Sequence, residues 1–129
     1  IGIVDFSGPT DQLDIVEKRF IDWKLQINKE ISSTDIGNAM FPDDGYAPKE
    51  SIIKYEPISY FDKNDPPFFL WHGGNDDQVF PSTFENFIKL LNQNRTKNEI
   101  MFNQNAGHSP KSGELKEAYD QIFIFLDKL

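Results

Sequence analysis

The chain has 129 residues, a formal net charge of −8, no cysteine, and hydrophobic residues at 38% of its positions. A chain of this length can bury roughly two-thirds of its unfolded surface in one domain, and we expect residues 1–129 to form a single unit. The negative charge disfavours nucleic acid as a partner, and no apolar run approaches the roughly 20 residues needed to span a bilayer. Without cysteine, disulfides and thiol catalysis are excluded.

Ile1–Phe6 is an apolar run that ends at Ser7-Gly8-Pro9, which predicts a buried strand followed by a turn. Because this run begins at residue 1 without Met, we expect a fragment of a longer protein. A signal peptide can be neither found nor excluded, so the compartment stays open, with a slight preference for the cytoplasm. An apolar strand edge in water invites pairing, and we expect self-association into a homo-oligomer through this strand.

A helix is predicted next, with Thr10 or Asp11 as its N-cap. Apolar residues at helical spacing form its buried stripe: Leu13, Val16, Phe20, Trp23 and Ile27. Four charged residues of this helix are expected to face solvent: Asp14, Glu17, Lys18 and Lys24. Residues 32–49 lack periodicity and predict a long loop, a lid or an insertion. A short helix is predicted over residues 48–55.

Phe68–Trp71 is predicted to be a central buried strand, which ends at a Gly-Gly turn and leads into a loop carrying Asp76 and Asp77. Ser82 and Glu85 match a capping box and predict a helix beginning near Ser82. Residues 99–102 predict a third strand. The last helix is predicted from a stripe of apolar residues: Leu115, Tyr119, Ile122, Leu126 and Leu129, widened by Phe123 and Phe125. Strands that alternate with helices indicate an α/β fold with a three-stranded parallel sheet and flanking helices.

The chain has two histidines, and each stands beside a glycine, one at the end of a predicted strand and one in the loop that follows a predicted strand. His72 ends the central strand, and His108 lies in the loop after the third strand. Because neighbouring parallel strands end at the same edge of a sheet, Asp76 and His108 are expected to converge. A carboxylate beside an imidazole fixes its tautomer and stabilises the imidazolium, which is how a general base is built.

These segments resemble the C-terminal part of the α/β-hydrolase fold. Four of them appear in the family's order: Val4-Asp5-Phe6 with Gly8-Pro9-Thr10-Asp11, Pro57-Ile58-Ser59-Tyr60, Pro66–Gly73 with Asp76 and Val79, and Ala106-Gly107-His108. The first is similar to strand six of the feruloyl-esterase-like and acetyl-esterase-like branch. The resemblance implies strands six to eight of an esterase or lipase, with Asp76 as triad acid and His108 as general base.

The same resemblance implies supporting roles for four neighbours of the pair. His72 and Gly73 would be structural, Asp77 would be exposed or capping, and Asp11 would order the loop after the first strand. The family's nucleophile is the Ser of Gly-x-Ser-x-Gly, and that motif does not occur in this sequence. We therefore expect this chain to be a portion of a serine ester hydrolase that is inactive alone. The resemblance implies no cofactor, and it implies a small ester as the substrate of the intact parent.

Three alternatives stay open. A serine peptidase of the prolyl-oligopeptidase type shares the same C-terminal pattern. A non-catalytic binding or interaction module would explain the missing Ser. A metal site formed by His72, Asp76, Asp77 and His108 is the weakest alternative, because their spacing matches no metal motif. We therefore expect no bound metal.

Overall fold

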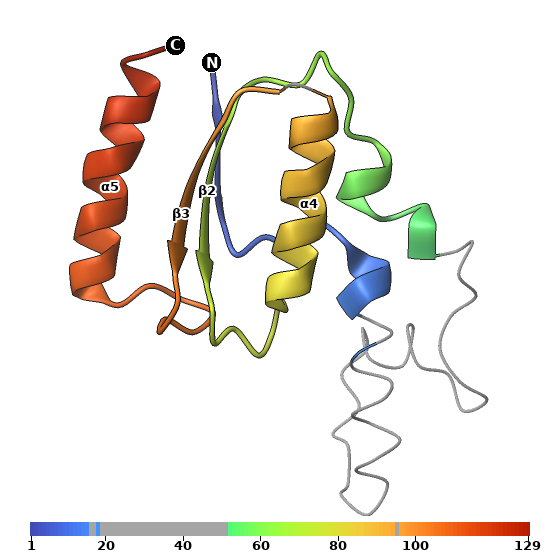
Figure 1. Ribbon diagram of the computed structural model, residues 1–129, viewed down its shortest axis with the longest axis horizontal. Helices are drawn as coiled ribbons and strands as arrows, with labels where there is room; N and C mark the ends of the chain where they lie inside the picture. Colours follow the sequence, from blue (N-terminus) through green and yellow to red (C-terminus); the bar gives the residue numbers. More distant parts are fainter. Residues whose placement is uncertain (16–17, 19–51, 95) are drawn as a thin grey trace, which may run out of the picture.

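The computed structural model describes residues 1–15, 18, 52–94 and 96–129. Three parallel strands, β1 (Ile3–Phe6), β2 (Phe68–Gly73) and β3 (Asn98–Asn103), form one sheet in the order β1-β2-β3. Helix α4 (Pro81–Gln93) covers one face and α5 (Ser112–Leu126) covers the other (Figure 1). The predicted α/β fold, with a three-stranded parallel sheet between helices, is confirmed.

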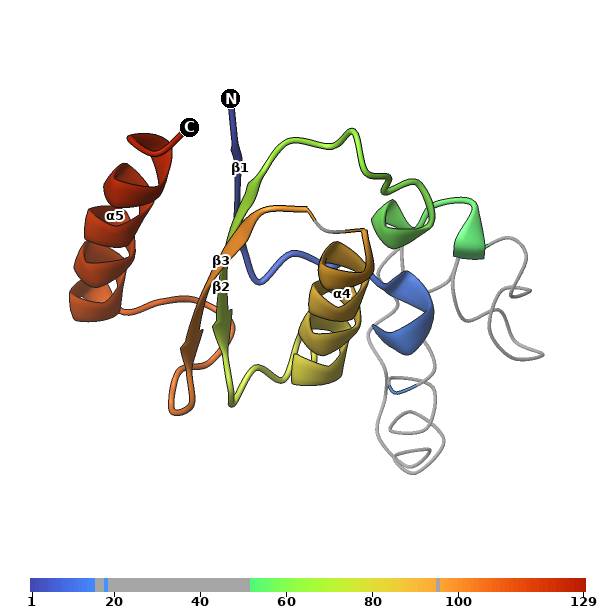
Figure 2. The same ribbon diagram turned by 45° about the horizontal axis from the view of Figure 1, so that its top comes forward.

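Strand β2 is the centre of the molecule, and all six of its residues are buried. Because successive side chains of a strand point to opposite faces, β2 supplies both halves of the core. Phe68 and Leu70 pack with α4, whereas Phe69 and Trp71 pack with α5. Figure 2 shows the resulting three layers, with the sheet between α5 and α4. A continuous apolar run is what a strand covered on both faces requires.

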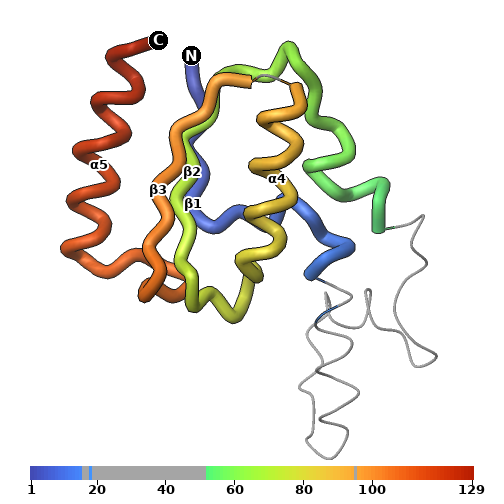
Figure 3. Tube along the Cα trace, viewed as in Figure 1, coloured from blue at the N-terminus to red at the C-terminus, as the bar shows by residue number. Residues whose placement is uncertain are grey.

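Strand β1 lies at an edge of the sheet, and it is more exposed than the sequence predicts. Ile3 and Val4 are 36% and 38% exposed, because β1 pairs with β2 alone among the described residues. The two chain termini lie side by side next to this edge (Figure 3), where Gly2 approaches Leu129. Self-association through β1 stays a prediction, and light scattering that finds a monomer would contradict it.

The predicted capping box of α4 is wrong. The helix begins at Pro81 with Phe80 as N-cap, and no side chain caps it. Proline is favoured at the first helical position because its missing N–H is not needed there. Ser82 is therefore already inside the helix, and its hydroxyl bonds to Asp14 instead of the helix backbone.

The buried face of α5 is also displaced from the predicted stripe. The residues packed on the sheet are Ala118, Ile122 and Phe125, at helical spacing. Ile122 and Phe125 were predicted to be buried, but other members of the expected face are exposed: Tyr119, Phe123, Leu126 and Leu129. Small Ala118, which is fully buried, lets the helix backbone approach the sheet closely.

The first predicted helix is seen at residues 12–15 and 18, and helical residues occur again at Ile52 and Ile53 before the short helix η1 (Pro57–Ser59). The rest of the first apolar stripe and the predicted loop over residues 32–49 lie outside the described residues. In the part of the chain that is described, no helix has the length and apolar character to cross a membrane.

Candidate active site

Asp76 lies in the loop between β2 and α4, and its side chain has no exposed surface. Its Oδ1 accepts the backbone N–H groups of Gln78 and Val79, both at 2.9 Å. Burial raises the pKa of this carboxyl, but these N–H donors and the contact with His108 outweigh burial and lower the pKa below its ordinary 3.8. Asp76 is therefore a carboxylate at neutral pH, held in one orientation by its own loop.

The second oxygen of that carboxylate faces His108. The distance between His108 Nδ1 and Asp76 Oδ2 is 3.0 Å, and the His108 side chain is 32% exposed. Because a carboxylate can only accept, Nδ1 donates the hydrogen, and Nε2 is the ring nitrogen left to accept a proton. Sequence reasoning predicted this convergence from residues 32 positions apart.

Backbone contacts between two loops bring the pair together. Gly74 N–H donates to Asn103 O and Asn75 N–H donates to Ala106 O, each at 2.8 Å. A Cβ on Gly73 would lie 2.1 Å from Gly107 O, closer than real Cβ atoms come to any neighbour. Gly73 therefore allows the end of β2 to lie directly against the loop that carries His108.

His72, the last but one residue of β2, is 1% exposed. It supports the acid loop, which is the segment between β2 and α4 that carries Asp76. Its Nε2 donates to Val79 O at 3.1 Å, and its ring stacks on Phe84 at a centroid distance of 4.7 Å. Burial lowers the pKa of His72, so the ring is neutral, and its 3.7 Å separation from Asp76 is not an ion pair. The ring thus holds the backbone of the segment that leads from Asp76 to α4.

The structure also places the two other carboxylates named from the sequence. Asp77 is exposed, beside the buried Asp76. Asp11 Oδ1 accepts the N–H of Asp14 at 3.0 Å, the geometry of an N-cap, and Asp11 Oδ2 accepts from Asn86 of α4 at 2.9 Å. Asp11 thus caps the first helix and ties it to α4.

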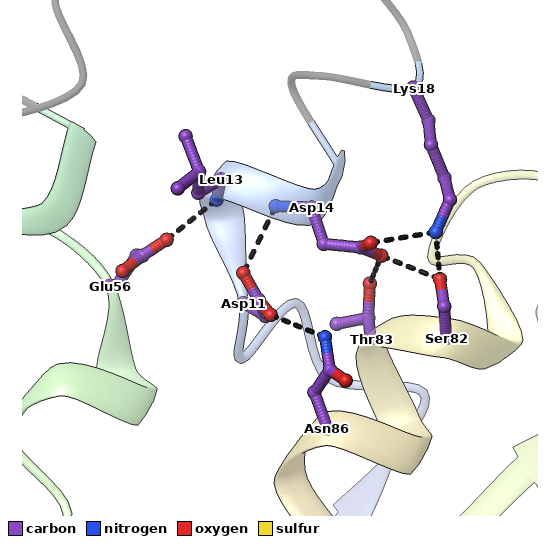
Figure 4. A network of polar contacts seen from close by, with 8 residues as sticks. All are labelled: Asp11, Leu13, Asp14, Lys18, Glu56, Ser82, Thr83 and Asn86. Carbon is purple, nitrogen blue, oxygen red and sulfur yellow. Dashed lines mark hydrogen bonds and ion pairs between the residues drawn. The ribbon is translucent and has the colours of Figure 1, made fainter.

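Sequence reasoning missed a network of polar contacts beside the site. Asp14 and Lys18 were expected to face solvent, but they face the first turn of α4 (Figure 4). Glu56 is buried, and its Oε1 accepts the N–H of Leu13 at 2.7 Å. Their partners are 43 to 69 positions away in sequence, and no local pattern signals such contacts.

The described residues contain no group of three His, Asp or Glu side chains arranged to hold a metal ion. What the site can do is move a proton. An imidazole whose Nδ1 is bound to a buried carboxylate, and whose edge is accessible, can take a proton at Nε2 while the carboxylate stabilises the resulting positive charge.

A model of the prolyl oligopeptidase family matches residues 15–129. The chain belongs to this family. A search of curated protein sequences found no significant match. Among solved structures, a truncated form of a carbohydrate esterase from gut microbiota matches 98% of the chain with a TM-score of 0.67 and 19% identity.

The prolyl oligopeptidase family match and this structural match confirm that the chain is an α/β-hydrolase portion. The chain covers 41% of the esterase chain, which is less than half of it. A SOBER1 variant from Arabidopsis thaliana also matches, with a TM-score of 0.43, 19% identity, and coverage of 95% of this chain and 70% of that chain. At 19% identity, the match to the carbohydrate esterase shows the fold.

Proposed function

We propose that Asp76 and His108 are the acid and the general base of a Ser-Asp-His ester hydrolase, and that these 129 residues are inactive without a nucleophile. The observation that carries the proposal is the bond between His108 Nδ1 and the buried Asp76 carboxylate. The carbohydrate esterase that shares the fold supports an ester as the substrate.

In the proposed reaction, a serine hydroxyl supplied from outside the described residues gives its proton to His108 Nε2 as its oxygen attacks the ester carbonyl. The imidazolium then gives this proton to the leaving alcohol. Asp76 keeps Nδ1 protonated and stabilises the transient positive charge without taking the proton itself. A water molecule then repeats the sequence to release the acid.

A longer protein that contains this sequence provides the test of these roles. His108→Ala and Asp76→Asn should each lower kcat/KM for p-nitrophenyl acetate by roughly 10³- to 10⁴-fold, while KM changes little. Asp77→Asn is the matched control, because it changes the neighbouring, exposed carboxylate. Full activity of His108→Ala would overturn the proposal and favour a non-catalytic module.

The 129 residues alone test the claim of inactivity. Hydrolysis of p-nitrophenyl acetate by this chain above the buffer rate, abolished in His108→Ala and kept in Asp77→Asn, would contradict that claim. Calorimetric titration with zinc or calcium tests the metal alternative, and stoichiometric binding lost in Asp76→Asn would favour it.

The family match supports a second candidate, a serine peptidase of the prolyl-oligopeptidase type. Both reactions use the same acid and base, so Asp76 and His108 do not separate them. Comparing kcat/KM of the longer protein for p-nitrophenyl acetate and for a proline p-nitroanilide separates them, and a clear preference for the anilide would replace the esterase by the peptidase.

A further inference from the structure

The Asp14 carboxylate joins the start of the first helix to the start of α4 (Figure 4). Its Oδ2 accepts the hydroxyls of Ser82 at 2.6 Å and Thr83 at 2.8 Å, and its Oδ1 accepts Lys18 Nζ at 2.7 Å. Lys18 also contacts the Ser82 hydroxyl. Burial raises the pKa of Asp14, but these donors outweigh it and lower the pKa, so the group is a carboxylate with both oxygens engaged.

This arrangement differs from a surface ion pair. The Asp14 side chain is 19% exposed and Thr83 is fully buried, so water does not compete freely for the contacts. Ser82 and Thr83 are the second and third residues of α4, a helix that has no side-chain cap of its own. Asp14 therefore brings a negative charge to the positive end of the α4 dipole, and its Oδ2 accepts hydrogen bonds from two hydroxyls there.

The first turn of α4 continues directly from the loop that holds Asp76. Thr83 N–H donates to Phe80 O at 2.9 Å and closes the turn. The residue before Phe80 is Val79, whose N–H donates to Asp76 Oδ1 and whose carbonyl accepts from His72. Asp14 thus anchors one end of this short segment, and Asp76 and His72 hold the other end.

We propose that Asp14 is a positioning residue for the Asp76–His108 pair, because it fixes the first turn of α4 and thereby the loop that carries Asp76. The proposal rests on the proposed function for its meaning in catalysis. The proposal predicts that Asp14 determines where Asp76 lies relative to His108, and this placement can be measured without any substrate.

A second contact between the same two segments provides the matched control. Asp11 Oδ2 accepts from Asn86 Nδ2, about one turn further along α4 and away from the Asp76 loop. Asn86→Ala removes one contact between the first helix and α4 and leaves the first turn anchored. Asp14→Ala removes the anchor of that turn.

The test is NMR on the folded 129-residue chain. In Asp14→Ala, the pKa of Asp76, followed by its carboxyl ¹³C shift, should rise, because loosened N–H bonds no longer outweigh burial. Exchange of the His108 Nδ1–H with water should become about tenfold faster, since the bond to Asp76 opens more often. Asn86→Ala should change neither quantity, and Asp14→Asn, which keeps one acceptor oxygen, should restore part of both.

Two results would overturn the proposal. If Asp14→Ala lowers stability but leaves the Asp76 pKa and the His108 exchange rate unchanged, Asp14 is a helix contact only. If Asn86→Ala shifts both as much as Asp14→Ala, docking of the whole helix matters and not its first turn. Should Asp14→Ala not fold, Thr83→Val, which removes one of the two hydroxyls at nearly constant volume, is measured in the same way against the same two results.

These readouts also separate this proposal from the proposed function. If the longer protein keeps full activity in His108→Ala, the triad assignment fails, and the NMR result for Asp14 stands on its own. If the triad assignment holds but the Asp76 pKa does not move in Asp14→Ala, only the positioning role fails.

Discussion

The two loops of the candidate site are built differently. Asp76 is fully buried, with backbone N–H groups of its own loop on Oδ1 and His108 on Oδ2. His108 is about one-third exposed and is bound to Asp76 through Nδ1. A buried carboxylate must be supplied with donors by the fold, because an unpaired charge in the interior is costly. An imidazole that exchanges protons with a substrate must stay within reach of it, and this difference is what a general base and its orienting acid require.

The largest effect is expected from removing the acid. Asp76→Ala leaves the N–H groups of Gln78 and Val79 without their acceptor, the first in a partly buried and the second in a buried position. Each unsatisfied buried donor costs about 1–3 kcal/mol, so the free energy of unfolding should fall by about 3 kcal/mol. Urea denaturation measures it, with Asp77→Ala as the control, which removes an exposed carboxylate of the same loop and should lower stability less. Equal losses of stability in the two variants would show that the Asp76 carboxylate stabilises this loop no more than Asp77 does.

Two glycines sharpen the comparison, because Gly73 ends β2 just before the acid loop and Gly107 lies in the loop that carries His108, the base loop. A Cβ on Gly73 would lie 2.1 Å from Gly107 O and 2.5 Å from Ala106 O, whereas a Cβ on Gly107 would meet nothing within 4 Å. Gly73→Ala must push the two backbones apart and should cost about 2 kcal/mol in urea denaturation. Gly107→Ala should stay within about 0.5 kcal/mol. A costly Gly107→Ala would mean that the base loop is as constrained as the end of β2.

The sequence was sufficient for the parts of this site that follow strand geometry. Phe68–Trp71 is an uninterrupted apolar run between Pro-Pro and His-Gly-Gly, so β2 could be placed, and parallel strands bring the residues after their ends together. The contacts of Asp14 could not be predicted, because they depend on how two helices are rotated when they meet. The face of α5 was misjudged because Phe123–Leu126 is apolar on every side, and helical periodicity alone does not choose among such faces.

Protonation of Asp76 should lower the free energy of unfolding less than removal of its side chain does, because a protonated carboxyl still accepts hydrogen bonds. The pKa of Asp76 is lower in the folded chain than its ordinary 3.8, so below that value the unfolded state binds the proton more readily. The stability that Asp76 contributes is fully present above about pH 4 and is lost as the pH falls through the folded-state pKa. Urea denaturation across this range should show a smaller acid loss in Asp76→Asn than in the unaltered chain or in Asp77→Asn. An unchanged acid loss in Asp76→Asn would contradict the lowered pKa.

The smallest effect on stability is expected from removing the base. In His108→Ala, water can replace the partly exposed imidazole on Asp76 Oδ2, so the free energy of unfolding should fall by less than about 1 kcal/mol. His72→Ala is the matched control, because that ring is buried, stacks on Phe84 and donates to Val79 O, and its loss should cost about 3 kcal/mol in the same urea experiment. Equal losses for the two histidines would make His108 a structural support like His72. If His108→Ala leaves the chain stable and abolishes the activity of the longer protein, His108 acts in proton transfer and not in folding.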